Sequence, residues 1–141
     1  MSDAVNAKPD PLLIPILSAS NFVIGMGAFI VIGLLNPIAE DLALSTAAAG
    51  WIMTVYALAY AVLSPLLISA TGRVGRRRVL ATGLGLFALA NGLAGIAPDE
   101  LTLNIARVLA AAGAGIFTPV SSAVAAGLST PERRARALAA V

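Results

Sequence analysis

The stretch TGRVGRRRVL, residues 71–80, carries four of the nine basic side chains of the chain: Arg73, Arg76, Arg77 and Arg78. Residues 42–72 before it and residues 79–98 after it contain no charged side chain. Short loops rich in lysine and arginine remain on the cytoplasmic side of a membrane, and long uncharged segments cross it. The stretch therefore predicts a tight loop between two membrane-spanning segments.

The composition agrees with a membrane protein. The chain has 141 residues, of which 59% are hydrophobic and 11% are charged, and its mean hydropathy is +0.93. A soluble domain averages roughly 45–50% apolar and about 25% charged residues. This chain has too little polar surface to cover a water-soluble globule.

Several kinds of site are not expected. The chain has no histidine and no cysteine, so disulfides, thiol nucleophiles and the commonest metal ligands are absent, and the carboxylates lie outside the apolar segments. We therefore expect no enzyme, no metal and no bound cofactor. The net charge of +2 does not indicate a nucleic-acid partner, because the arginine runs adjoin apolar segments and no aromatic platform accompanies them.

Four segments have the length and composition to cross a membrane: residues 12–37, 47–70, 79–97 and 101–128. A span needs about 20 mostly apolar residues. Helix is expected, because lipid offers no hydrogen-bond partners to the backbone. The predicted fold is an all-α polytopic membrane protein with four transmembrane helices.

The charges between the spans predict the orientation. Lys8, the arginine loop and the basic residues after the fourth span fall on one side, whereas Glu40, Asp41, Asp99 and Glu100 fall on the other. The positive-inside bias then places both termini in the cytoplasm. We expect a cytoplasmic tail at 1–11, a membrane part at 12–128, and a cytoplasmic loop with the start of a fifth helix at 129–141.

The string Gly72-Arg73-Val74-Gly75-Arg76-Arg77-Arg78 resembles the loop between helices two and three of the major facilitator superfamily, which runs approximately G-x-x-x-D-R-x-G-R-R. Residues 36–66 resemble the end of helix one, the outer loop and helix two of that family. Residues 107–140 resemble helix four and a P-E-x-R-x-x-A inner loop. The nearest likeness is to the drug and sugar efflux branch, which includes arabinose-efflux-type permeases.

The loop departs from the family signature at two positions. Gly72 replaces the aspartate that precedes the first arginine, and Ile68 replaces the leading glycine. In the family that aspartate belongs to a charge relay between the two halves of the transporter, so the resemblance does not extend to this relay. We also expect Gly75 to adopt a positive φ in so short a turn.

Arg107 is the one charged side chain that falls within an expected span, and it matches the helix-four arginine of the family, followed by Gly113, Gly115 and Pro119. The resemblance implies that Arg107 couples proton or substrate movement. The alternative is that the span begins at 108 and that Arg107 reaches the outer surface. A charge at membrane depth is costly, which favours the functional interpretation.

Four other polar side chains are candidates for a substrate path: Asn21, Tyr56, Tyr60 and Asn91. Tyr56 and Tyr60 are four residues apart and share a helix face. Hydrogen bonds between helices are the alternative role for each of these residues.

Pairs of small residues mark two expected helix contacts. Ala111 with Gly115 and Ala88 with Gly92 form small-xxx-small patterns, which permit close approach of helices in a membrane.

The resemblance implies a secondary transporter, with proton-coupled efflux of a small solute such as a drug or a sugar across a bacterial inner membrane. Family members have about twelve helices, with the substrate site near the midplane between two halves. A chain of four spans is then expected to be an N-terminal fragment, whose partners are the lipid bilayer, the substrate and the remainder of the transporter. The alternatives are a small dimeric multidrug exporter, which needs a buried carboxylate that these spans lack, and a non-transporting four-helix remnant.

Overall fold

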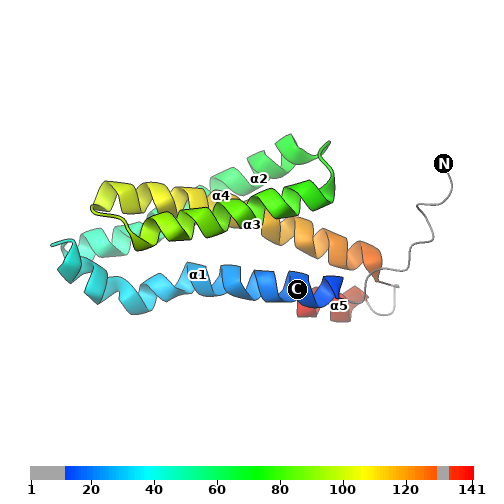
Figure 1. The fold of residues 1–141 in the computed structure, drawn as a ribbon, viewed down its shortest axis with the longest axis horizontal. Coiled ribbons are helices and arrows are strands. Elements are labelled where there is room, and N and C mark those ends of the chain that lie inside the picture. The colour runs from blue at the N-terminus through cyan, green and yellow to red at the C-terminus, as the bar shows by residue number, and fades with distance from the viewer. Residues whose placement is uncertain (1–11, 130–133) are drawn as a thin grey trace.

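The computed structural model describes residues 12–129 and 134–141, in which the chain forms five helices (Figure 1). These are α1 (Leu13–Asp41), α2 (Thr46–Thr71), α3 (Arg76–Gly95), α4 (Glu100–Leu128) and α5 (Arg134–Ala140). The predicted N-terminal tail at 1–11 and the first part of the predicted loop at 129–141 lie outside the described residues. The first four helices are long and apolar enough to cross a membrane, which confirms the all-α class and the four expected spans.

The helix ends differ from the expected spans by a few residues. α2 and α4 begin one residue after Ser45 and Asp99, whose side-chain oxygens accept hydrogen bonds from backbone N–H groups three residues further on, at 3.2 and 2.8 Å. α1 continues to Asp41, four residues beyond the predicted end at Pro37. α3 begins at Arg76, so three arginines form its first turn instead of belonging to the loop.

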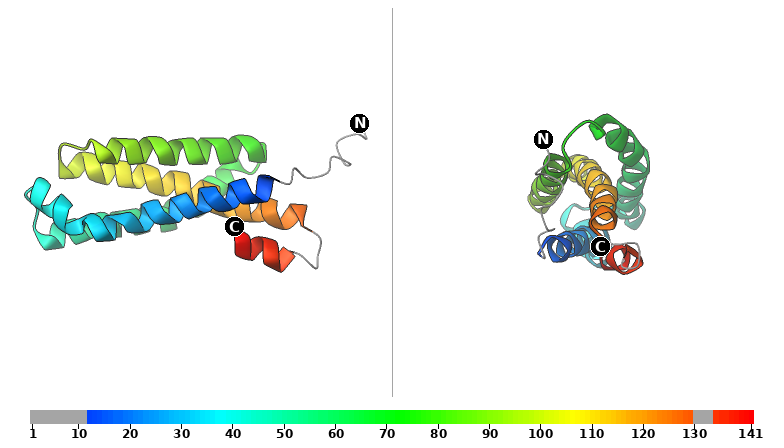
Figure 2. Two further views of the ribbon diagram at one scale, coloured as in Figure 1. Left: turned by 60° about the horizontal axis from the view of Figure 1, so that its bottom comes forward. Right: turned by 90° about the vertical axis from the view of Figure 1, so that its right-hand side faces the viewer.

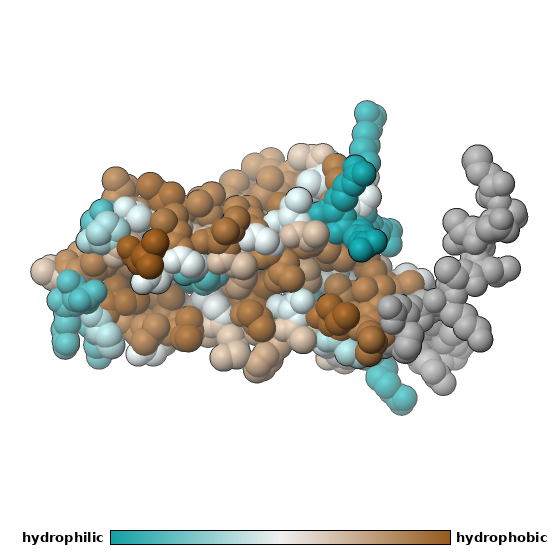
Figure 3. Space-filling view, in the orientation of Figure 1, coloured by the Kyte–Doolittle hydropathy of each residue, from teal (hydrophilic) through white to brown (hydrophobic). Residues whose placement is uncertain are grey.

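Successive helices run antiparallel, and α4 is the central one (Figures 1 and 2). The end-on view in Figure 2 shows α2 and α3 on either side of α4, with α1 next to it on a third side. α4 also has the most buried residues, although all four long helices expose some large apolar side chains. The space-filling view shows an apolar belt between polar ends, as expected for a bundle surrounded by lipid (Figure 3).

α3 and α4 approach each other most closely at two glycines. A Cβ placed on Gly113 would lie 2.7 Å from the carbonyl oxygen of Gly83 and 2.7 Å from the backbone nitrogen of Phe87. A Cβ on Gly83 would lie 3.1 Å from the carbonyl oxygen of Gly113. The backbones of the two helices are therefore in direct contact, and only glycine fits at position 113.

α2 and α4 meet at a backbone group that a proline leaves free. Pro119 has no N–H to give to the carbonyl of Gly115, four residues earlier in α4. The hydroxyl of Ser64 in α2 donates to this carbonyl at 2.8 Å. The absence of a side chain at Gly115 also lets Ser64 come this close to α4, because a Cβ on residue 115 would crowd Ser64 Cβ at 3.1 Å.

Two expectations about glycine and alanine are wrong. Gly75 has φ −58° and ψ 130°, because it serves as the extended residue that precedes α3. Among the described residues the only positive φ belongs to Ala43, at 50°, in the joint between α1 and α2. Ala88 and Gly92 are exposed and a Cβ on Gly92 would meet nothing within 4 Å, so this pair makes no close helix contact within the described chain.

Replacing Gly113 with alanine is expected to destabilise the bundle by about 1–3 kcal/mol, because the added methyl group overlaps the backbone of α3. Unfolding of the purified chain by sodium dodecyl sulfate in mixed micelles measures this change. Gly92→Ala is the matched control, because its methyl group enters open space and improves helix propensity by up to about 1 kcal/mol. Equal losses in the two variants would contradict the backbone contact.

Replacing Ser64 with alanine is expected to cost about 0.6 kcal/mol, the average for a hydrogen bond between helices in a membrane protein. In a Pro119→Ala background the helix supplies its own donor to the Gly115 carbonyl, so the same Ser64→Ala change should cost less. The double-mutant cycle, measured by the same unfolding assay, isolates this coupling. Ser69→Ala is the control, because Ser69 bonds only within its own helix, to the Pro65 carbonyl.

Candidate functional site

Arg107 lies inside the bundle, two turns from the start of α4. Only 2% of its surface is exposed, so the alternative that it reaches the outer surface is wrong. Its Nη1 donates to the Gly27 carbonyl at 3.1 Å and its Nη2 donates to the Ala28 carbonyl at 3.4 Å, both in α1. Its central carbon lies 4.2 Å from the ring centre of Tyr56 in α2. Arg107 therefore ties three helices together.

The positive charge of Arg107 has no anionic partner in the part of the chain that the structure describes. Its contacts are two neutral carbonyls and an aromatic ring, and its Nε has no hydrogen-bond partner. The described carboxylates lie at helix ends: Glu40, Asp41, Asp99 and Glu100. A buried charge without a counter-charge is unfavourable, and this arrangement leaves the guanidinium ready to attract an anionic group.

Gly27 is the feature of α1 that makes this contact possible. A Cβ on Gly27 would lie 2.6 Å from the tip of the Phe87 ring of α3, so a larger residue here would require this ring to move. Its carbonyl is then within reach of Arg107. No sequence pattern distinguishes Gly27, since many glycines occur in these spans.

A cavity of about 540 Å³ lies beside Tyr56, between α1 and α2. Three of the four predicted path residues line it, namely Asn21, Tyr56 and Tyr60, and Thr118 of α4 joins them. The two tyrosine rings are stacked, with centres 6.4 Å apart and planes at 28°. The cavity thus presents aromatic surface and a few polar groups, which is the usual build of a small-molecule site.

Asn21 and Asn91 have different positions. Asn21 donates from Nδ2 to the Ser121 hydroxyl at 2.7 Å, and its buried Oδ1 has no hydrogen-bond partner among the described residues. Asn91 donates to the Phe87 carbonyl of its own helix at 2.7 Å and does not line the cavity. The structure therefore brings Asn21 to the candidate site and leaves Asn91 away from it.

Asn104 was not among the predicted site residues. Its Oδ1 is buried without a hydrogen-bond partner in the part of the chain that the structure describes, and Asn104 lies one turn before Arg107 on α4. Residues three apart share a helix face, so this spacing was the available signal.

The loop and helix-four motifs have separate places. Gly72, Arg73 and Gly75 belong to the joint between α2 and α3, and Arg76, Arg77 and Arg78 form the exposed first turn of α3. In helix four, Gly113 contacts α3, and Gly115 and Pro119 create the contact with Ser64. The glycines of that motif therefore pack helices. Among the motif residues of helix four, Arg107 is the one that contacts a residue lining the cavity, Tyr56.

Comparison with known proteins agrees with this architecture. The sequence profile of the Major Facilitator Superfamily matches residues 17–141. The MFS-type transporter YbcL of Bacillus subtilis is 34% identical over 89% of the chain, and the inner membrane transport protein YdhP of Escherichia coli is 35% identical over 87%. The puromycin resistance protein pur8 of Streptomyces alboniger is 36% identical over 92%.

The matches cover 32%, 32% and 26% of these relatives, so the chain spans about a third of their length or less. The family match extends over most of the chain and includes three spans in full and the first span from residue 17. The chain therefore belongs to the Major Facilitator Superfamily, a family of multi-pass membrane transporters and not of enzymes.

Proposed function

We propose that this chain forms the N-terminal part of a secondary transporter that exports a small solute, with Arg107 as its coupling residue. The observation that carries the proposal is the buried guanidinium, which has no counter-charge among residues 12–129 and 134–141 and contacts a tyrosine that lines a cavity of about 540 Å³. The drug-resistance name of the Streptomyces relative supports export as the direction. The activity belongs to the whole transporter, because the matched relatives are about three times longer than this chain.

The chemistry of arginine limits how Arg107 can act. An arginine keeps its charge in proteins, so it does not carry the transported proton itself. It acts on an acidic group or an anionic substrate group that approaches it during the transport cycle. Such a group is attracted when it is ionised and released when it is protonated, which links proton binding to movement of the helices.

The proposed orientation places the arginine-rich end in the cytoplasm. Arg73, the first turn of α3, and Arg134 and Arg136 of α5 lie at the same end of the bundle (Figure 1), whereas Glu40, Asp41, Asp99 and Glu100 lie at the other. This separation follows the positive-inside bias. Both termini are then cytoplasmic, and the membrane is a bacterial inner membrane, as the name of the Escherichia coli relative states for that protein.

Arg107→Met in the complete gene is expected to reduce export at least about tenfold, equivalent to the loss of roughly 1.4 kcal/mol of coupling. Cellular accumulation of puromycin and of fluorescent efflux dyes measures this effect. Methionine removes the charge and retains most of the volume, so the stability of the 141-residue chain should remain unchanged or increase. Arg78→Met is the control, because Arg78 is exposed at the helix start. Normal export by Arg107→Met would exclude Arg107 from coupling, and a parallel loss of stability would indicate a structural role.

Single cysteines test the orientation, because the chain has none of its own. Val74, in the arginine loop, and Ile96, in the joint between α3 and α4, are 45% and 78% exposed. A membrane-impermeant maleimide added to intact spheroplasts should label Ile96→Cys and should label Val74→Cys only after permeabilisation. The reverse pattern would place the arginine-rich end outside and overturn the proposed topology.

A further inference from the structure

Two polar atoms inside the bundle lack a hydrogen-bond partner and belong to the same helix. Arg107 Nε and Asn104 Oδ1 are both buried, and neither bonds to any residue in the part of the chain that the structure describes. Nε is a donor and Oδ1 is an acceptor, so each offers what the other lacks. The third such atom, Asn21 Oδ1, is remote, because Asn21 bonds to Ser121, fourteen residues further along α4.

The geometry of α4 places these two side chains together. Asn104 precedes Arg107 by three residues, and residues at this spacing have Cβ atoms about 5–6 Å apart. Side chains on a helix lean toward its N-terminus, so the stem of Arg107 extends over the turn that contains Asn104. The Nη atoms of Arg107 donate to the carbonyls of Gly27 and Ala28, which leaves Nε as its one nitrogen without a partner among the described residues.

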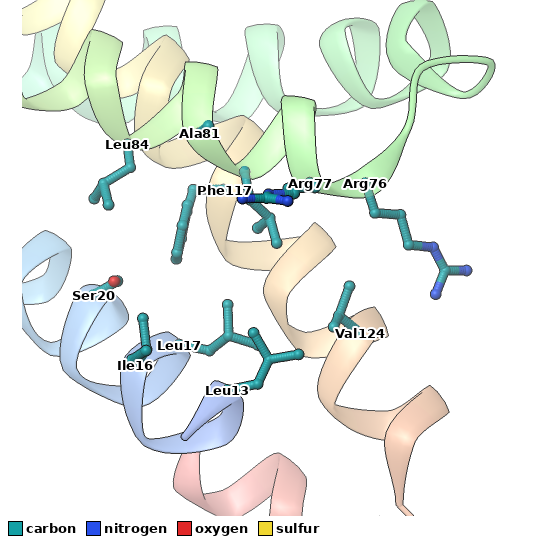
Figure 4. Close-up of a pocket in the computed structure, with 11 residues that line it drawn as sticks. Leu13, Ile16, Leu17, Ser20, Arg76, Arg77, Ala81, Leu84, Phe117 and Val124 are labelled. Atoms are coloured by element: carbon teal, nitrogen blue, oxygen red, sulfur yellow. The ribbon is translucent and has the colours of Figure 1, made fainter. Parts of the chain in front are cut away.

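No group outside the bundle reaches these atoms, because the described helices themselves enclose both. The cavity of about 360 Å³ between α1, α3 and α4 (Figure 4) has Arg76 and Arg77 at its edge and does not extend to either atom. The cavity beside Tyr56 is lined by neither Asn104 nor Arg107. A partner for each atom must therefore come from within the bundle, and the two atoms suit each other.

We propose that Asn104 is a positioning residue for Arg107, with Asn104 Oδ1 accepting a hydrogen bond from Arg107 Nε. A rotation of either side chain, or one water molecule between them, completes this bond. The guanidinium is then held on one edge by its own helix and on the other by the carbonyls of α1. This inference rests on the coupling role proposed for Arg107. An anionic group meets an arginine of fixed orientation, which reduces the cost of ordering it.

Asn104→Asp tests the contact in the 141-residue chain, by unfolding with sodium dodecyl sulfate in mixed micelles. A carboxylate beside Arg107 supplies its missing counter-charge, so the folding equilibrium constant at neutral pH should rise about tenfold. In an Arg107→Met background the same change buries a carboxylate without a partner, so the constant should fall. A change of the same sign in both backgrounds would overturn the proposal.

Asn21→Asp is the matched control, because Asn21 also has a buried Oδ1 without a partner in the described chain but lies away from Arg107. Its effect on unfolding should be the same in the unmodified and Arg107→Met backgrounds. If Asn21→Asp depended on Arg107 as strongly as Asn104→Asp does, a general attraction of negative charge would explain both results, and the specific pairing would be excluded.

The same position tests the role in export, in the complete gene. Asn104→Asp gives the guanidinium a permanent partner and should reduce puromycin export at least about tenfold, as expected for Arg107→Met. Asn104→Gln retains an amide oxygen and should retain export. Normal export by Asn104→Asp would overturn the positioning role. Normal export by Arg107→Met would contradict the proposed function instead, and the reversal of sign in the unfolding assay still tests the contact, because it does not depend on transport.

Discussion

The contact of α4 with the backbones of its neighbours is the constraint on which the bundle depends. Lipid tails are as apolar as the side chains that helices present to one another, so helices in a membrane associate through close packing and hydrogen bonds. Gly113 provides the first, against Gly83 and Phe87, and Gly115 provides the second, through Ser64. These two glycines are two residues apart and therefore face different sides of α4. One short segment holds α2 and α3 at once, and this places α4 in the centre.

The central position of α4 explains why Arg107 is buried. Arg107 lies six residues before Gly113 on the same helix, and its guanidinium is enclosed where α1 and α2 pack against α4. The carbonyls of Gly27 and Ala28 and the ring of Tyr56 replace water around it. None of these groups carries a formal charge, and they compensate the lost hydration only in part. The glycines of helix four thus affect Arg107 indirectly. They hold α4 in the centre of the bundle, where water is excluded and the charge of Arg107 acts over a long range.

The sequence predicted the features that depend on charge and length, and failed where two helices had to be placed against each other. The four spans follow from uncharged segments between charged joints, and the structure confirms them. The pairing of Gly83 with Gly113 depends on how α3 is rotated about its own axis. The sequence of α3 alone does not specify this rotation. The same limit applies to the two asparagines: Asn21 faces the cavity and Asn91 bonds to its own helix, although both are single polar residues in apolar spans. Gly75 adopts an ordinary φ because a four-residue joint closes without a left-handed residue at that position.

The arginines at the start of α3 oppose the dipole of their own helix. Positive charge at a helix N-terminus is unfavourable by about 0.3–1 kcal/mol per residue. The neighbouring helix offsets this cost, because α4 ends at the same side of the bundle and its C-terminal turn attracts positive charge. Arg76 reaches Gly127 in that turn, and Arg134 of α5 donates from Nε to the Ala126 carbonyl at 3.3 Å. The basic residues are therefore placed by the end of α4 and by the membrane surface, which explains how a motif that disfavours its own helix is compatible with a stable bundle.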